Sequence, residues 1–205
     1  MRTTIGFDFD MTLVDTSNSL FETLKVVFPR ENKLQIEQSK FQLNGLPLDQ
    51  ILLHYCHQKD LSKFKKEFMT AYQTVGIKKA KLIPGAVESL EIVHQMGYDP
   101  VIISAKSGEN LTKLIKIFNL PIKKIHSEKH GKEKTKTMIG EKTILYIGDQ
   151  ESDVSAAHSV PIPALRLMGD ADSSETVADW QLNDISMFPR WFQWWVESAS
   201  FRKGV

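Results

Sequence analysis

Short apolar runs alternate with amphipathic segments through residues 84–168, and this alternation restricts the fold more than any other feature. The apolar runs have the character of strands that are covered on both faces. With the start of the chain, the expected strands are residues 3–7, 101–103, 125–127, 143–147 and 164–168. The expected helices between them are residues 86–96, 110–119, 132–139 and 152–159. Such alternation implies parallel strands with right-handed crossovers, so we predict an α/β fold with a doubly wound, Rossmann-like sheet.

Residues 16–83 have a different pattern, with apolar side chains at helical spacing and no expected strand. The expected helices are residues 17–28, 31–43, 48–56 and 60–72, with Asp60 as an N-cap. Gly45, in the loop 44–47, marks a helix end. We therefore predict a core domain of residues 1–15 and 84–205 and an inserted small α-helical cap domain of residues 16–83.

Composition excludes several classes of partner. Of the 205 residues, 41% are hydrophobic and 25% charged, as in ordinary globular proteins, and the formal net charge is +1. A charge this small gives no general attraction to nucleic acid or anionic membranes. Cys56 is the single cysteine, so an intrachain disulfide is impossible. We expect a soluble, cytoplasmic monomer or homodimer with no nucleic-acid or membrane partner.

The segment 188–196 carries five aromatic residues, three of them tryptophan. One interpretation is a terminal helix that packs its rings on the core. The alternative is an exposed patch for a partner or a dimer.

Polar residues follow three of the expected strands: Asp8 with Asp10, Ser104, and Asp149 within the segment 148–153. Alternate side chains of a strand share a face, so Asp8 and Asp10 would point the same way if the strand continued. Alone, this pair could equally be a solvated turn. In open α/β sheets, however, ligands bind at the carboxyl ends of strands, and the shared placement indicates a site there.

Three or four carboxylates without a histidine or cysteine partner suit a hard cation, and Mg²⁺ fits best. Zinc is disfavoured because the six histidines are scattered. The hydroxyls of Thr12 and Ser104, nearby backbone N–H groups and a lysine would hold phosphate oxygens. Such a site leaves one carboxylate as a nucleophile and another as a proton carrier.

Residues 8–16 resemble the first motif of the haloacid dehalogenase superfamily. Ser104 after its apolar run resembles the second motif, and residues 148–153 resemble the fourth. The pair Pro84-Gly85 and the helical insert are similar to the phosphoglycolate phosphatase-like branch, whose inserted helical domain is called a C1 cap.

The resemblance implies a role for each matching residue. Asp8 would be the nucleophile and a magnesium ligand. Asp10 would carry the proton and offer its backbone carbonyl to the metal. Asp149 would be the second carboxylate on magnesium, with Asp153 a further ligand or a partner of the ligands. Ser104 would bind the transferring phosphoryl group.

Further substrate contacts are expected from Thr12, Gly45 in the cap loop, and Ala105 after Ser104. For the lysine of the third motif, Lys132 is preferred and Lys134 is the second candidate. Lys106 is either a further contact or a surface residue.

The chain departs from the family pattern at two positions. Met11 stands where the family commonly has glycine, and we expect an ordinary backbone conformation there, because methionine does not readily adopt positive φ. Ala105 stands where asparagine is common, which removes a possible polar contact.

The resemblance implies a magnesium-dependent phosphatase that hydrolyses a small phosphorylated metabolite through an aspartyl-phosphate. The alternatives are a phosphomutase or phosphotransferase of a sugar phosphate, and a non-enzymatic binding or regulatory protein that retains the fold.

Overall fold

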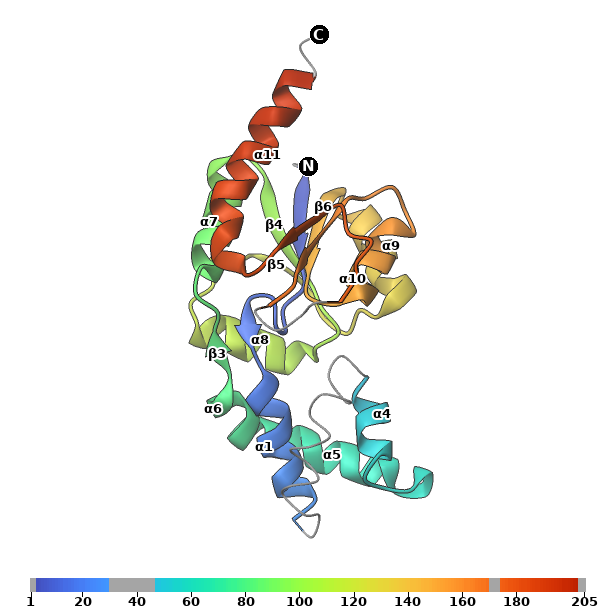
Figure 1. Cartoon of the computed structure of the whole chain (residues 1–205). Helices are drawn as coiled ribbons and strands as arrows, with labels where there is room; N and C mark the ends of the chain where they lie inside the picture. Colours follow the sequence, from blue (N-terminus) through green and yellow to red (C-terminus); the bar gives the residue numbers. More distant parts are fainter. Residues whose placement is uncertain (1–2, 30–46, 170–173, 203–205) are drawn as a thin grey trace. The chain divides into compact units, whose positions relative to one another are not determined.

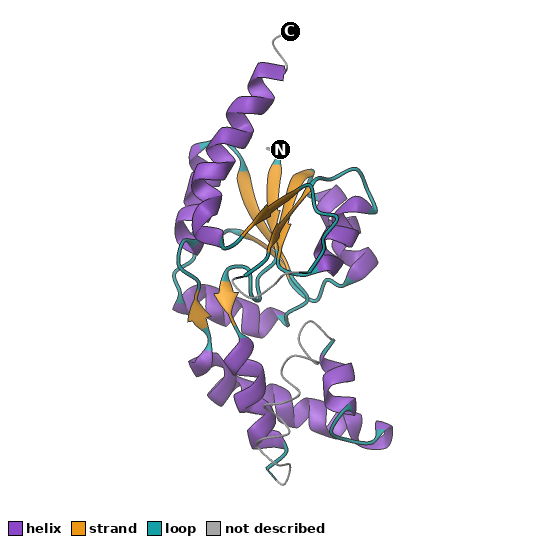
Figure 2. Ribbon diagram, viewed as in Figure 1, coloured by secondary structure: helices purple, strands orange, loops and turns teal. Residues whose placement is uncertain are grey.

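The computed structural model describes residues 3–29, 47–169 and 174–202. The chain divides into two compact units, one of Met1–Val14 with Leu82–Val205 and one of Asp15–Lys81. The first unit holds an α/β sheet, and the second is mostly helical (Figures 1 and 2).

The first unit is built on six parallel strands in the order β5-β4-β1-β6-β7-β8. The strands are β1 Thr4–Phe7, β4 Asp99–Ile103, β5 Lys124–His126, β6 Thr143–Gly148, β7 Ala164–Leu167 and β8 Trp180–Leu182. Two shorter strands, β2 Val14–Asp15 and β3 Lys81–Leu82, form a separate sheet. β1 comes first in the chain but lies in the middle of the large sheet, between β4 and β6.

Helices cover both faces of this sheet (Figure 1). The helices of this unit are α7 Ala86–Gln95, α8 Gly108–Ile117, α9 Gly131–Gly140, α10 Glu151–His158, the 3-10 turn η3 Ile185–Met187, and α11 Phe188–Arg202. On one face, Met138 of α9 and Val154 of α10 pack with Tyr146 of β6. On the other, the ring of Phe188 in α11 meets Phe7 of β1 at a centroid distance of 5.4 Å. The doubly wound α/β prediction is therefore confirmed.

The aromatic segment of α11 contributes to the core. Phe188 and Phe192 are completely buried, and their rings stack at 5.2 Å. Trp194, in contrast, is 55% exposed. The packing interpretation is confirmed for the two phenylalanines, while Trp194 faces solvent.

The second unit contains α1 Ser17–Val27, α4 Leu48–Leu53, η1 Gln58–Asp60, α5 Leu61–Ala71, the π-helical segment η2 Tyr72–Gly76, and α6 Ile77–Lys79. The ring of Phe28, after α1, lies 4.8 Å from that of Phe64 in α5 and 5.3 Å from that of Tyr55. Leu24 and Leu52 are completely buried. The apolar spacing read from the sequence thus marks the faces on which these helices pack.

Several details differ from the prediction. Residues 16–83 were expected to lack strands, yet β3 begins at Lys81. β8 was also missed, because its three residues Trp180–Leu182 have a glutamine in the middle and form no apolar run. Asp60 precedes α5, but its side chain makes no capping hydrogen bond to the described residues. The expected helix 31–43 and Gly45 lie outside the described residues. In the described ranges, no helix is long and apolar enough to cross a membrane.

Candidate active site

The three central strands place polar residues at one edge of the sheet. Asp8 follows β1, Ser104 follows β4, and Asp149 follows β6. The backbone N–H of Asp8 donates to the Ile147 carbonyl at 2.8 Å, which fixes the end of β1 against β6. Because the strands are parallel, their carboxyl ends meet, as the sequence analysis expected.

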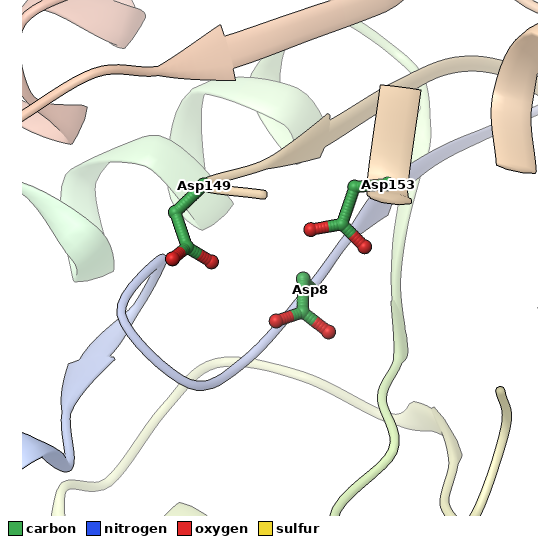
Figure 3. A group of neighbouring side chains, drawn as sticks. All are labelled: Asp8, Asp149 and Asp153. Atoms are coloured by element: carbon green, nitrogen blue, oxygen red, sulfur yellow. The ribbon is translucent and has the colours of Figure 1, made fainter. Parts of the chain in front are cut away.

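Asp8, Asp149 and Asp153 form a compact acidic group. Each offers a carboxylate oxygen, and these oxygens lie within 4.8 Å of one another. The three side chains point toward a common point (Figure 3). Asp153 lies in the first turn of α10, where its carboxylate accepts from the backbone N–H of Gln150 at 3.3 Å. A Cβ on Gly148 would collide with this carboxylate, so the close approach of α10 depends on glycine there.

Lys134, on α9, is the lysine that reaches the acidic group. Its Nζ donates to Asp8 Oδ1 at 3.0 Å and to Asp153 Oδ1 at 2.6 Å, and the residue is buried. Lys132 is exposed. The preference for Lys132 is corrected here: the two residues lie two positions apart on one helix, about 200° around its axis, so they face nearly opposite ways.

Electrostatics indicate that this group needs a further positive charge. Burial, and then the charges of Asp153 and Asp10, raise the pKa of Asp8 to about 7, although Lys134 opposes the shift. Burial, and then Asp8 and Asp153, raise the pKa of Asp149 to about 8. Burial alone would lower the pKa of Lys134, but Asp8 and the other neighbours raise it overall. One ammonium thus faces three carboxylates, and a divalent cation with oxygen ligands fits the remaining charge and the spacing.

Asp10 stands apart from the acidic group. Its side chain is 33% exposed and pairs with Lys106, whose Nζ lies 2.8 Å from Asp10 Oδ1. Thr12, next along this loop, is completely buried, and its Oγ1 has no hydrogen-bond partner within the described part of the chain.

Met11 has a φ of 60°, in the left-handed region. The expectation of an ordinary backbone conformation is therefore wrong. The loop closes tightly. The N–H groups of Leu13 and Val14 both donate to the Phe9 carbonyl, and the N–H of Met11 donates to the Val14 carbonyl. This closure requires positive φ at position 11 whichever residue occupies it.

Ser104 is buried at the end of β4, and its Oγ accepts from the backbone N–H of Lys106 at 3.3 Å. Ala105, between them, is exposed. Both residues thus lie in the loop at the carboxyl edge of the sheet where they were expected.

Sequence reasoning missed two residues around the site. Arg166 on β7 is buried, and its Nε donates to the Asp149 carbonyl at 3.2 Å while Nη1 pairs with Glu151 at 3.0 Å. Tyr146 on β6 donates its hydroxyl to the Ile103 carbonyl at 2.7 Å, and its ring centroid lies 5.4 Å from Lys134 Nζ. Arg166 could have been found from the sequence, because a charged residue inside an expected apolar strand is unusual. Tyr146 could not, because its position in the sequence is that of an ordinary core aromatic residue.

A model of the family described as haloacid dehalogenase-like hydrolase matches residues 5–166. This range includes Asp8, Ser104, Lys134 and Asp149, and it spans most of the chain. The chain belongs to the haloacid dehalogenase-like hydrolases. The resemblance noted from the motifs is confirmed, and the chain is an enzyme of a hydrolase family.

Solved structures of other haloacid dehalogenase-like proteins share the fold. A family hydrolase from Streptococcus pneumoniae is 19% identical with a TM-score of 0.79, over 94% of this chain and 99% of that one. A protein described as a predicted phosphoglycolate phosphatase, from Haemophilus somnus, is 17% identical with a TM-score of 0.73, over 94% and 98%. A protein described as a β-phosphoglucomutase, from Thermotoga maritima, is 18% identical with a TM-score of 0.73, over 93% and 98%. No curated protein matches the sequence closely enough to show a relationship.

Proposed function

We propose that this hydrolase is a magnesium-dependent phosphatase that removes the phosphoryl group from a small phosphorylated metabolite. The observation that carries the proposal is the compact group of Asp8, Asp149 and Asp153 with Lys134 at the carboxyl edge of the sheet. Asp8, Asp149 and Asp153 would hold Mg²⁺, which when bound supplies positive charge beside the phosphate oxygens. The backbone carbonyl of Asp10 remains a fourth proposed ligand.

In the first step, a carboxylate oxygen of Asp8 attacks phosphorus and the bond from phosphorus to the substrate oxygen breaks. Asp10 gives its proton to that oxygen, so the substrate leaves as a neutral alcohol and an aspartyl-phosphate remains. Lys134 and Ser104 would hold the phosphoryl oxygens, which carry the negative charge.

In the second step, water attacks the phosphorus of the aspartyl-phosphate. Asp10, now a carboxylate, accepts a proton from the water, and the bond between phosphorus and Asp8 breaks. Inorganic phosphate leaves, and both aspartates return to their starting states.

The first test is hydrolysis of an aryl phosphate by purified protein with Mg²⁺. We expect activity that stops on addition of EDTA and is abolished in Asp8→Asn, with the thermal unfolding midpoint of the metal-free variant close to that of the parent or above it. Full turnover by Asp8→Asn would exclude Asp8 as the nucleophile. No turnover by the wild-type protein, on aryl phosphates or on a wider panel, would favour a binding role.

A phosphomutase is the second candidate, because Asp8 and Asp10 are both present and a mutase uses the same pair. A panel of sugar phosphates, phosphoglycolate, nucleotides and pyrophosphate separates the two functions. Phosphate release supports the phosphatase, whereas isomerisation of a sugar phosphate without phosphate release supports the mutase. In either case we propose that the helical unit Asp15–Lys81 acts as a cap that selects the substrate.

A further inference from the structure

Lys106 has a largely covered side chain with a specific partner in the candidate site. Its side chain is 8% exposed, although lysine is among the residues that are seldom buried. Its Nζ lies 2.8 Å from Asp10 Oδ1. Two lysines of the site thus have different partners: Lys134 contacts Asp8 and Asp153, and Lys106 contacts Asp10.

The backbone that carries Lys106 is held by the last residue of β5 and by the segment that follows it. The Ser104 N–H donates to the His126 carbonyl at 2.9 Å, and the Lys129 N–H donates to the Ser104 carbonyl at 2.9 Å. The Glu128 N–H donates to the Lys106 carbonyl at 3.0 Å. Glu128 has a φ of 57°, so this residue is in the left-handed conformation in the turn that makes these bonds. The loop 104–106 is therefore fixed at both of its ends.

Two further contacts of Lys106 restrict its position. Its backbone N–H donates to Ser104 Oγ at 3.3 Å, which links it to the hydroxyl proposed to bind the phosphoryl group. Its Nζ also lies 6.0 Å from the ring centroid of Phe9, the residue between Asp8 and Asp10 in the sequence. The side chain of Phe9 is completely buried. A cation at this distance from an aromatic face is weakly attracted to it. One residue thus joins the loop after β4 to the loop after β1.

We propose that Lys106 is a positioning residue that holds the Asp10 carboxylate in the orientation needed for proton transfer to the leaving group. The inference rests on the proposed phosphatase function. Lys106 fixes Oδ1 of Asp10 from a rigid loop, and the orientation of a proton carrier decides how well it transfers its proton. Lys134 contacts the nucleophile Asp8, and Lys106 orients the proton carrier Asp10.

This role makes a prediction that depends on the leaving group. The group displaced from an alkyl phosphate is a strongly basic alkoxide unless Asp10 protonates it. The group displaced from p-nitrophenyl phosphate is a stabilised phenolate, which needs little protonation. Loss of Lys106 should therefore slow the alkyl substrate much more than the aryl one. The quantity to compare is kcat/KM, because it covers the steps up to the first irreversible one, here formation of the aspartyl-phosphate.

The experiment measures kcat/KM for both substrates, with saturating Mg²⁺, in the wild type, Lys106→Met, Lys106→Gln and Lys106→Arg. We expect the methionine and glutamine variants to lose about 100-fold on the alkyl phosphate and less than about tenfold on p-nitrophenyl phosphate, in line with the usual size of acid–base catalysis. Arginine, which keeps the charge, should restore part of the loss. Lys116→Met, at an exposed lysine of α8, is the matched control and should change neither value.

A double variant shows whether Lys106 acts through Asp10. In an Asp10→Asn background, Lys106→Met should cause little further loss on the alkyl phosphate, because the group it positions is absent. Equal losses on the two substrates, or full additivity with Asp10→Asn, would overturn the inference and leave the phosphatase proposal standing. Thermal unfolding midpoints identify a variant that fails to fold. If Lys106→Met fails, kcat/KM is measured on Lys106→Gln instead. A wild type that hydrolyses neither substrate counts against the phosphatase proposal itself.

Discussion

Met11 illustrates how a loop can force an unfavourable conformation on a single residue. Its φ of 60° is needed for the turn in which Leu13 and Val14 donate to Phe9. Left-handed conformations cost side-chain-bearing residues roughly 1–2 kcal/mol. The chain therefore accepts backbone strain next to Asp10.

Replacing Met11 tests this strain. We expect Met11→Gly to unfold at a higher urea concentration than Met11→Ala, with a difference in unfolding free energy of about 1 kcal/mol, because glycine adopts positive φ without the Cβ penalty. Alanine is the matched control, since both variants remove the methionine side chain. At positions with ordinary φ, a glycine variant is less stable than an alanine variant. A lower urea midpoint for Met11→Gly than for Met11→Ala would therefore contradict the proposed backbone strain.

The two lysines of α9 give a second test at this scale. Lys134→Met should lower kcat for aryl phosphate hydrolysis by at least about 100-fold, because it removes the charge beside the attacking carboxylate. Lys132→Met is the comparison, as its side chain is exposed. A larger loss at Lys132 than at Lys134 would contradict the assignment of Lys134 as the lysine of the third motif.

At the scale of elements, the sequence predicted five of the six strands of the large sheet, including the edge strand β5, and missed β8 at the other edge. β1, β4, β6 and β7 are apolar runs that each end in a clear change of polarity, and each was placed to within one or two residues. β8 has a glutamine in the middle and β3 has only two residues, so neither forms an apolar run. Asp8, Ser104 and Asp149 followed from the strand ends. Lys134, Arg166 and Tyr146 reach the site through their orientation on elements, which depends on tertiary packing and which spacing alone does not supply.

Arg166 gives a test of how β7 supports α10 and the loop before it. Its guanidinium donates to the Asp149 carbonyl and pairs with Glu151. Arg166→Met should weaken Mg²⁺ binding about 10- to 100-fold, as is usual when a group that orients a metal ligand is lost. Isothermal titration calorimetry on metal-free protein measures this directly. Glu151→Gln, which leaves the contact with the Asp149 carbonyl in place, should have the smaller effect; the reverse order would assign the support to Glu151.

At the scale of the whole molecule, the acidic group makes stability depend on pH and metal together. The pKa values of Asp8 and Asp149 are raised to about 7 and about 8 from an ordinary value of 3.8. Between about pH 4 and pH 8, the folded state thus binds protons that the unfolded state has released. Without metal, these two groups make the fold less stable as the pH rises through that window.

Thermal unfolding with EDTA or with Mg²⁺ checks this sign. We expect Mg²⁺ to raise the unfolding midpoint more at pH 8.5 than at pH 6, because at low pH the cation competes with bound protons. Asp149→Asn removes one of the titrating groups and should reduce the difference between the two pH values. An equal midpoint increase at both pH values would mean that these carboxyls titrate normally.

The central place of β1 also affects how the protein is made. Thr4 pairs with Asp99 and Thr143, so the strand that precedes Asp8 gains both of its neighbours only after β6 has been synthesised. At translation rates of about 5–20 residues per second, β6 is complete roughly 7 to 28 seconds after β1. During that time the apolar edges of β1 are open to other chains. Contacts between residues so distant in sequence also slow folding. The site and the sheet are therefore completed together, late in folding, and a nascent chain that carries the nucleophile has no assembled site in which to use it.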